Sequence, residues 1–173
     1  MIRVGLSILL SLVVNLGHTM SMSMKEKHIF GYVERVNLPE LKASVKAKLD
    51  TGAKSSSLSA INIQETEEGE TIYLTFTVPL KTGSVTMKRP LVGKVKIKSR
   101  AGEHVKGKVT PKPIHRPVIN LIVQLGTKTR EIEVNLTNRK RFNYPLLLGR
   151  DALIQFDIVV DPAVSFIAET KEK

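Results

Sequence analysis

The chain has 173 residues, with 27 Lys and Arg against 16 Asp and Glu, a formal net charge of +11, and neither Cys nor Trp. This length suits one domain with its own core, while the lack of Cys excludes a disulfide scaffold, a cysteine nucleophile, an iron–sulfur cluster and a thiolate zinc site. Aromatic residues make up 5 %, which argues against a stacking platform for single-stranded nucleic acid, and the positive charge favours anionic partners.

Residues 1–23 have the layout of a secretion signal. A positive charge at Arg3 precedes an apolar run over 4–16 and a small, polar exit over 17–23. The run is short for a membrane span, which needs about 20 apolar residues. We therefore expect a signal peptide, or alternatively an uncleaved anchor, followed by a periplasmic or secreted domain over 24–173. A start at Met20, Met22 or Met24 would instead leave the protein in the cytoplasm.

The remaining chain reads as an all-β domain. Alternating apolar runs bounded by turn residues predict strands over 29–36, 44–49, 71–78, 94–98, 118–125, 131–136, 144–148 and 158–160. An acidic loop is expected over 65–70, a hairpin turn over 126–128 and one short helix over 151–155. Many short strands separated by turns indicate a sandwich or a barrel.

Two motifs stand out at predicted strand ends. The first is Asp50-Thr51-Gly52-Ala53, which offers a carboxylate that can act as an acid or a base if its surroundings shift its pKa. The second is the apolar run 146–148 followed by Gly149-Arg150-Asp151. Each motif alone is more often an ordinary turn than a site, because Asp and Gly favour turns. The pair, almost a hundred residues apart, is the more specific signal.

This pair resembles the motifs of the retropepsin-type aspartic peptidases. The pattern over 48–58 with H-R-P-V over 115–118 is more similar to a bacterial branch labelled ATP-dependent zinc protease and associated with glutamate-ligase systems. The resemblance implies a closed β-barrel with one short C-terminal helix. It also implies a catalytic Asp50, with Thr51 bracing the loops of two subunits and Gly52 contacting the substrate through its backbone.

For the second motif, the resemblance implies structural support of the site. Gly149 would pack under the active-site loop that contains Ala53, and Arg150 would form a salt bridge near the substrate channel. Acidic residues usually follow the Ala in viral members, but here Lys54 does. We therefore expect Asp151 to pair with Lys54 in a charge-swapped arrangement.

Aspartic peptidase chemistry needs two carboxylates that share one proton. The chain has a single Asp-Thr-Gly, so a catalytic protein would be a two-fold homodimer with Asp50 from each subunit at the axis. The alternative is a non-catalytic domain on the same fold that binds an acidic peptide or an envelope partner.

No metal or other cofactor is expected. The chain has no H-E-x-x-H motif, the spacing of His28, His104 and His115 matches no standard zinc site, and no Walker A sequence is present.

A basic segment follows the middle of the chain. Residues 81–116 hold eleven Lys and Arg against one acid, Glu103. The resemblance implies that the region from about 87 to 109 includes the flap. Its basic residues would then face an anionic substrate such as a glutamate-rich peptide, whereas the plainer interpretation is a solvated strand face. No nucleic-acid motif is present. The candidate flap residues are Lys94, Lys96, Lys98 and Arg100.

Overall fold

The structure is a computed structural model, and it describes residues 27–97 and 114–168. The predicted signal over 1–23 lies outside the described residues. No helix within the described part of the chain is long and apolar enough to cross a membrane.

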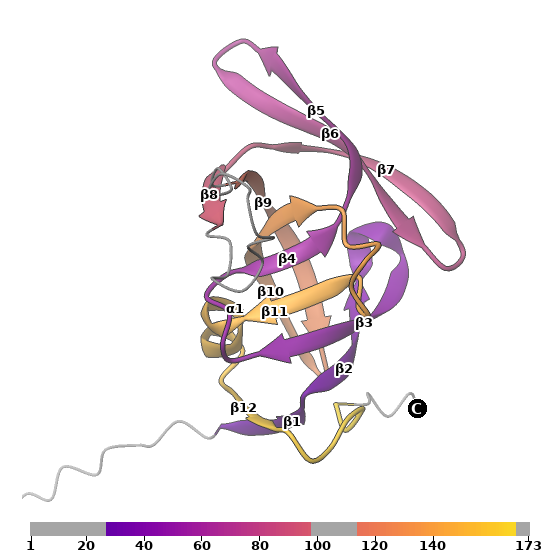
Figure 1. The fold of residues 1–173 in the computed structure, drawn as a ribbon, viewed down its shortest axis with the longest axis vertical. Helices are drawn as coiled ribbons and strands as arrows, with labels where there is room; N and C mark the ends of the chain where they lie inside the picture. The colour runs from indigo at the N-terminus through magenta and orange to yellow at the C-terminus, as the bar shows by residue number, and fades with distance from the viewer. Residues whose placement is uncertain (1–26, 98–113, 169–173) are drawn as a thin grey trace, which may run out of the picture.

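A closed β-barrel forms the body of the molecule (Figure 1). Six strands follow one another in the order β10-β4-β11-β3-β2-β9, and pairing between β9 and β10 closes the ring. A seventh strand, β8, Gly93–Ile97, extends the sheet beyond β9 outside the ring. The barrel strands are β2, Val33–Leu38; β3, Ala43–Asp50; β4, Ser56–Ser59; β9, Ile114–Leu125; β10, Lys128–Thr137; and β11, Leu146–Gly149.

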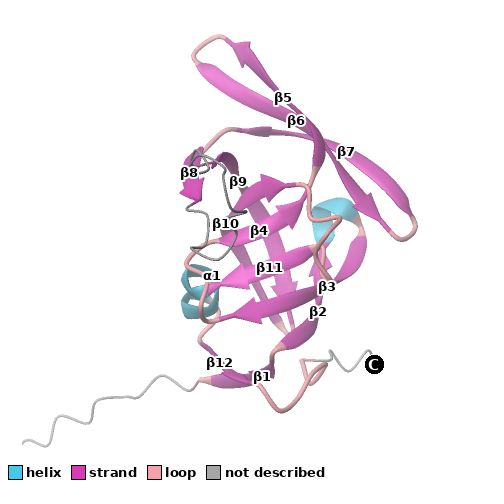
Figure 2. Cartoon of the chain, viewed as in Figure 1, coloured by secondary structure: helices cyan, strands magenta, loops and turns pink. Residues whose placement is uncertain are grey.

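Helical structure is limited to two short elements within the described residues (Figure 2). The 3-10 helix η1, Pro39–Leu41, joins β2 to β3, and the α-helix α1, Arg150–Gln155, begins directly after β11. The predicted closed barrel with one short C-terminal helix is therefore confirmed.

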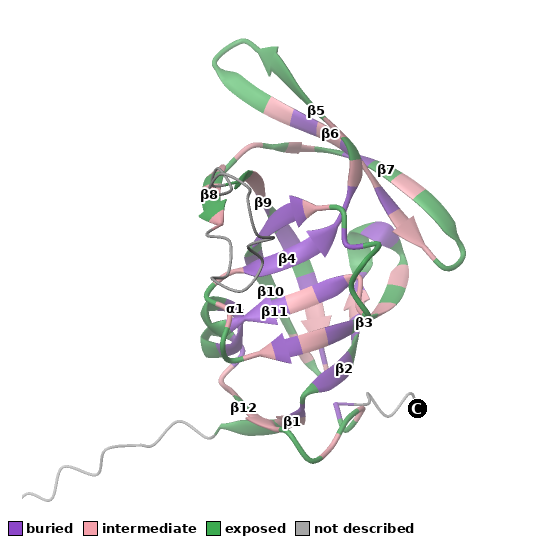
Figure 3. Ribbon diagram, viewed as in Figure 1, coloured by how far each residue is buried: buried purple, intermediate pink, exposed green. Residues whose placement is uncertain are grey.

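Two smaller sheets flank the barrel. Strand β1, His28–Gly31, pairs in parallel with β12, Ile158–Asp161. Strands β5, Ile61–Glu68, β6, Thr71–Leu80, and β7, Gly83–Pro90, form an antiparallel sheet that projects beyond the barrel (Figure 1). Most of this arm is exposed, in contrast to the barrel strands (Figure 3).

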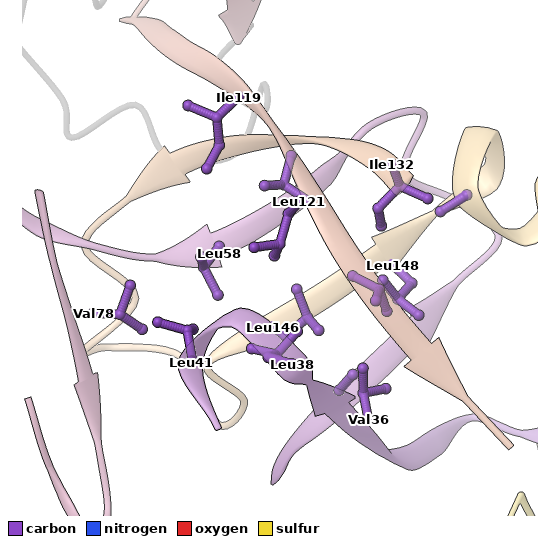
Figure 4. Packing of buried hydrophobic residues seen from close by; sticks show 14 of the residues in the cluster. Val36, Leu38, Leu41, Leu58, Val78, Ile119, Leu121, Ile132, Leu146 and Leu148 are labelled. Carbon is purple, nitrogen blue, oxygen red and sulfur yellow. The ribbon is translucent and has the colours of Figure 1, made fainter. Parts of the chain in front are cut away.

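The core lies inside the barrel because each strand turns alternate side chains inward. On β9, Ile119, Leu121 and Val123 are buried, and on β10, Ile132 and Val134 face them. Leucines from β2, β4 and β11 belong to the same cluster (Figure 4). Those leucines are Leu38, Leu58, Leu146 and Leu148.

Several predicted elements need correction. The strand expected over 29–36 is two strands, because the chain leaves the small sheet at Gly31 and Tyr32, where the amide of Tyr32 donates to the carbonyl of Val164. The loop expected over 65–70 is mostly the end of β5, where glutamates are tolerated on an exposed arm. Strand β6 continues through Pro79 because it has only β7 as a neighbour there.

Candidate active site

Asp50 ends β3 at the edge of a cleft, and its carboxylate shapes the loop that follows. The amide of Gly52 donates to Oδ1 of Asp50 at 3.0 Å, and the amide of Ala53 donates to the main-chain carbonyl of Asp50 at 3.3 Å. These two bonds fold residues 50–53 into a turn next to the strand end. The side chain of Asp50 remains 19 % exposed toward the cleft.

Residues 149–151, here called the clamp, hold this loop from beneath. Gly149 lies opposite Asp50 in the parallel pairing of β11 with β3. A Cβ on Gly149 would lie 2.6 Å from the carbonyl oxygen of Ser55, so only glycine fits. The amide of Arg150 donates to the carbonyl of Ala53 at 2.9 Å. The expected packing of Gly149 under the loop is thus present in the geometry.

Arg150 supports the loop in a different way from the expected salt bridge. Its Nη1 donates to the carbonyl of Thr51 at 3.0 Å and to the carbonyl of Gly52 at 3.3 Å. The guanidinium therefore satisfies backbone acceptors of the loop instead of an acidic side chain. Thr51 itself is exposed, and its bracing role between subunits stays a prediction.

The expected ion pair between Lys54 and Asp151 is wrong. The two residues are neighbours, since the amide of Asp151 donates to the carbonyl of Lys54 at 3.1 Å. Within the described residues, however, the ion pairs do not join their side chains. The backbone contact at the start of α1 sets their proximity, and both side chains reach solvent.

Lys48 is the charged partner of Asp50. Its Nζ lies 3.1 Å from Oδ2 of Asp50, and the two residues, two positions apart on β3, share one side of the strand. Burial acts to raise the pKa of Asp50, but the hydrogen bond and charge of Lys48, together with the amides of Gly52 and Ala53, outweigh it and lower the pKa. Asp50 is accordingly ionised at neutral pH in the single chain.

The cleft beside Asp50 has a volume of about 1480 Å³. Its floor is a row of residues in register across the sheet, and directly opposed residues in a sheet share one face. Helix α1 and the loop before β11 contribute to its walls. The row consists of Lys48, Leu147, Ser57, Asn135 and Val118.

Two arginines enter the cleft from outside the predicted site. Arg116 on β9 is half-buried, and Arg139, after β10, is only 6 % exposed. Sequence reasoning counted Arg116 within the basic segment and missed Arg139, Ser57 and Asn135. The alternation of β10 indicates that Asn135 faces away from the core, but N-R-K-R over 138–141 reads as an ordinary surface turn.

The predicted basic flap is only partly described. Lys96 lines the cleft, whereas Lys94 pairs with Glu65 on the arm at 2.8 Å. Lys98 and Arg100 lie outside the described residues. Residues 87–90 of the predicted flap region belong to β7 in the arm. Strand β8 lines the cleft and pairs with β9, while residues 98–109 lie outside the described part of the chain, so the flap stays a prediction.

Ion pairs reduce the basic character of the segment. Lys88 pairs with Glu68, and Arg89 with Glu40. Glutamates of β5 therefore neutralise two of the lysines in the basic segment, Lys88 and Lys94.

Within residues 27–97 and 114–168, His, Asp and Glu do not form a group of three or more that could hold a metal ion. The expectation that the protein uses no metal stays a prediction.

Curated relatives match most of this chain. Proteins named "Probable alpha-L-glutamate ligase" from Desulfotalea psychrophila and Shewanella pealeana are each 34 % identical to it, over 80 % and 81 % of this chain respectively. The chain spans 29 % and 30 % of their lengths, so it corresponds to one part of those proteins.

A solved structure shares the fold. A protein of unknown function from Legionella pneumophila superposes with a TM-score of 0.69 and 49 % sequence identity, covering 83 % of this chain and 100 % of that one. A family model described as "RimB-like: Retropepsin-like aspartic endopeptidase RimB" matches residues 29–171. Since that range contains the Asp50 loop, the clamp and every strand of the barrel, the chain belongs to the RimB-like family of retropepsin-like aspartic endopeptidases.

Proposed function

We propose that the protein is an aspartic endopeptidase that works as a homodimer and hydrolyses acidic, glutamate-rich peptides. The observation that carries this is the position of Asp50. A carboxylate stands at the edge of a cleft, on a loop held by the clamp, in a chain of the retropepsin-like family.

The chemistry requires a second Asp50 from a partner subunit. One ionised carboxylate takes a proton from water, whose oxygen forms a bond to the carbon of the scissile peptide carbonyl. The protonated partner donates its proton to the carbonyl oxygen. The tetrahedral intermediate then collapses, the C–N bond breaks, and the leaving nitrogen takes up a proton.

Two features support a dimer. The two-stranded sheet of β1 and β12 has no further strand on either side among the described residues, and a two-stranded sheet is marginally stable alone. Ile29 and Val159 are paired in register on one face and are 62 % and 44 % exposed. Exposed apolar residues beside open sheet edges favour association with a second copy.

The proposed location is periplasmic or secreted.

The test is cleavage of glutamate-rich peptides by the full chain between about pH 4 and pH 7, with the Asp50→Asn variant alongside. We expect cleavage by the unmodified chain and a loss of at least about a thousandfold in the variant, because an amide cannot act as the base. The side-chain oxygen of Asn can still accept the hydrogen bond from the amide of Gly52. The variant should therefore keep its fold, which circular dichroism checks. Equal cleavage by both proteins would exclude the aspartic mechanism.

The second candidate is a non-catalytic domain that binds an acidic peptide or an envelope partner. The ion pair of Lys48 with Asp50 favours it, because a carboxylate held ionised does not readily share a proton. A full chain that stays monomeric, cleaves nothing and still binds acidic peptides would support this alternative.

A further inference from the structure

We propose that Arg116, Arg139 and Ser57 form a subsite that binds a side-chain carboxylate of the peptide substrate. The inference rests on the proposed function, because the ligand is the peptide that Asp50 would cleave. It assigns the preference for acidic peptides to cleft residues instead of the basic flap.

Arg116 and Arg139 line the same cleft, and the charge of one acts on the other. Burial lowers the pKa of Arg139, the charge of Arg116 lowers it further, and Asp50 acts in the opposite direction. Among the described residues, the ion pairs within 4.0 Å involve neither arginine. A buried and a half-buried positive charge that lack an ion-pair partner among the described residues are unfavourable, so the cleft favours an incoming anion.

Both arginines are held in place by neutral groups. Nη1 of Arg116 donates to Oδ1 of Asn135 at 3.4 Å, and the amide nitrogen of Asn135 donates to the carbonyl of Ser56. Nε of Arg139 donates to the carbonyl of Tyr144 at 3.0 Å, with its guanidinium 4.6 Å from the ring of Phe142. Such anchoring positions the side chains before a ligand arrives and lowers the entropy lost on binding.

Unused donors point to the ligand class. Nε of Arg116 and Oγ of Ser57 are buried and form no hydrogen bond within the described residues. Both residues line the cleft, and both adjoin Asn135, Arg116 through its hydrogen bond and Ser57 through strand pairing. A carboxylate accepts several hydrogen bonds in one plane and matches the fork of a guanidinium. Buried polar groups are nearly always paired, so these donors indicate a bound acceptor.

The cleft also contains acidic side chains, but they do not neutralise the two arginines by forming ion pairs with them within the described residues. Glu131 and Glu133 on β10 and Asp151 on α1 also line the cleft. None of them forms an ion pair with Arg116 or Arg139 within the described residues. Asp50 and the three subsite residues line the same cleft, and the charge of Asp50 acts on Arg139. The bound carboxylate would therefore belong to a residue close to the scissile bond.

Binding measurements in the Asp50→Asn full chain test the subsite without turnover. The probes are fluorescently labelled tetraglutamate and tetraglutamine, both with blocked ends, and tetraglutamine with a free C-terminal carboxylate. Charge-assisted hydrogen bonds predict that blocked tetraglutamate binds at least about tenfold more tightly than blocked tetraglutamine. If only the free-ended tetraglutamine gains affinity, the cleft reads a chain terminus and the side-chain assignment is wrong.

Variants locate the preference. Arg116→Gln in the same background should bring the two blocked peptides within about threefold of each other, since it removes the fork. Arg141→Gln is the matched control, because Arg141 is exposed on the same loop as Arg139 and forms no hydrogen bond or ion pair within the described residues. It should keep the preference. A preference that persists in both Arg116→Gln and Arg139→Lys, or that is lost equally in Arg141→Gln, would overturn the proposal.

The comparison of blocked tetraglutamate with blocked tetraglutamine uses the same protein for both peptides. It therefore tests the subsite even if an arginine variant fails to fold. No detectable binding of tetraglutamate, or equal binding of both blocked peptides, overturns the subsite. Preferential binding without cleavage by the unmodified chain leaves the subsite intact and removes the peptidase function. Equal cleavage of both peptides would support the peptidase function and overturn the subsite.

Discussion

The ammonium group of Lys48 lies 3.1 Å from Oδ2 of Asp50, and the pH at which this carboxylate loses its charge depends on that contact. Although burial acts to raise the pKa of Asp50, Lys48 and the loop amides lower it overall. A depressed pKa in the folded state contributes stability above the unfolded pKa, and this contribution is lost as the pH falls through the folded value. Lys48 thus extends the ionised form of Asp50 toward acid pH.

Replacing Lys48 should move this titration upward. In Lys48→Gln we expect the pKa of Asp50 to rise, so that its contribution to stability becomes smaller and is lost at a higher pH. The measurement is an NMR titration of the Asp50 carboxyl carbon. Lys46→Gln is the control, because Lys46 is exposed on the same strand and contacts the ring of Phe166 at 5.1 Å. An unchanged or lower pKa in Lys48→Gln would show that the ion pair has no influence.

Individual residues of the site differed in how far the sequence revealed them. Asp50 and Gly149 belong to short motifs whose chemistry is local, so their positions could be predicted. The burial of Arg139 could not, because it depends on how the loop over 138–145 folds, with Nε of Arg139 donating to the carbonyl of Tyr144 and the guanidinium next to the ring of Phe142. The hydrogen-bond partners of Arg150 could not be predicted either, since a guanidinium binds carboxylates and backbone carbonyls alike.

At the scale of elements, the junction of β11 with α1 supports the loop that follows Asp50. In Gly149→Ala, the new Cβ would lie 2.6 Å and 2.7 Å from the carbonyl oxygens of Ser55 and Lys54. Both atoms belong to the backbone, so the loop or the helix must shift. We expect a loss of about 1–3 kcal/mol in the free energy of unfolding, as found for overpacked sites.

Urea unfolding of Gly149→Ala, compared with that of Gly93→Ala, measures this loss in the free energy of unfolding. Gly93→Ala is the control, because a Cβ on Gly93 meets nothing within 4 Å and its backbone lies outside the left-handed region. It should change the free energy of unfolding by less than about 0.5 kcal/mol. A Gly149→Ala protein as stable as Gly93→Ala would mean that the clamp tolerates a wider spacing.

Elements with clear alternation were predictable, and those with unusual composition were not. The β9–β10 hairpin over its Gly126 turn and the helix after Gly149 match the sequence patterns closely. Strand β4 was missed because three of its four residues are serines, which favour turns. It is buried all the same, since it lies between β10 and β11 in the sheet.

At the scale of the whole molecule, the proposed dimer makes a specific demand on the β1–β12 sheet. Ile29→Lys places a charge on its exposed apolar face, next to Val159. We expect this variant to be monomeric by size-exclusion chromatography with light scattering, and to lose cleavage with the dyad.

Ile72→Lys provides the comparison, because Ile72 is an exposed apolar residue on the arm. It should leave the mass unchanged. If Ile29→Lys remains dimeric, the subunits meet through another surface; if the unmodified chain is itself monomeric, a single Asp50 has no dyad partner.

The clamp joins parts of the chain that are far apart in sequence. Gly149, Arg150 and Asp151 hold residues 51–55, almost a hundred positions earlier. During synthesis the chain emerges from its N-terminal side, so the Asp50 turn leaves the ribosome long before its support exists. A nascent or truncated chain that ends before 149 lacks the residues that contact this turn. The order of the motifs therefore means that the Asp50 turn gains its support only when translation is nearly complete; under the proposed function, the chain could not act as a peptidase before that point.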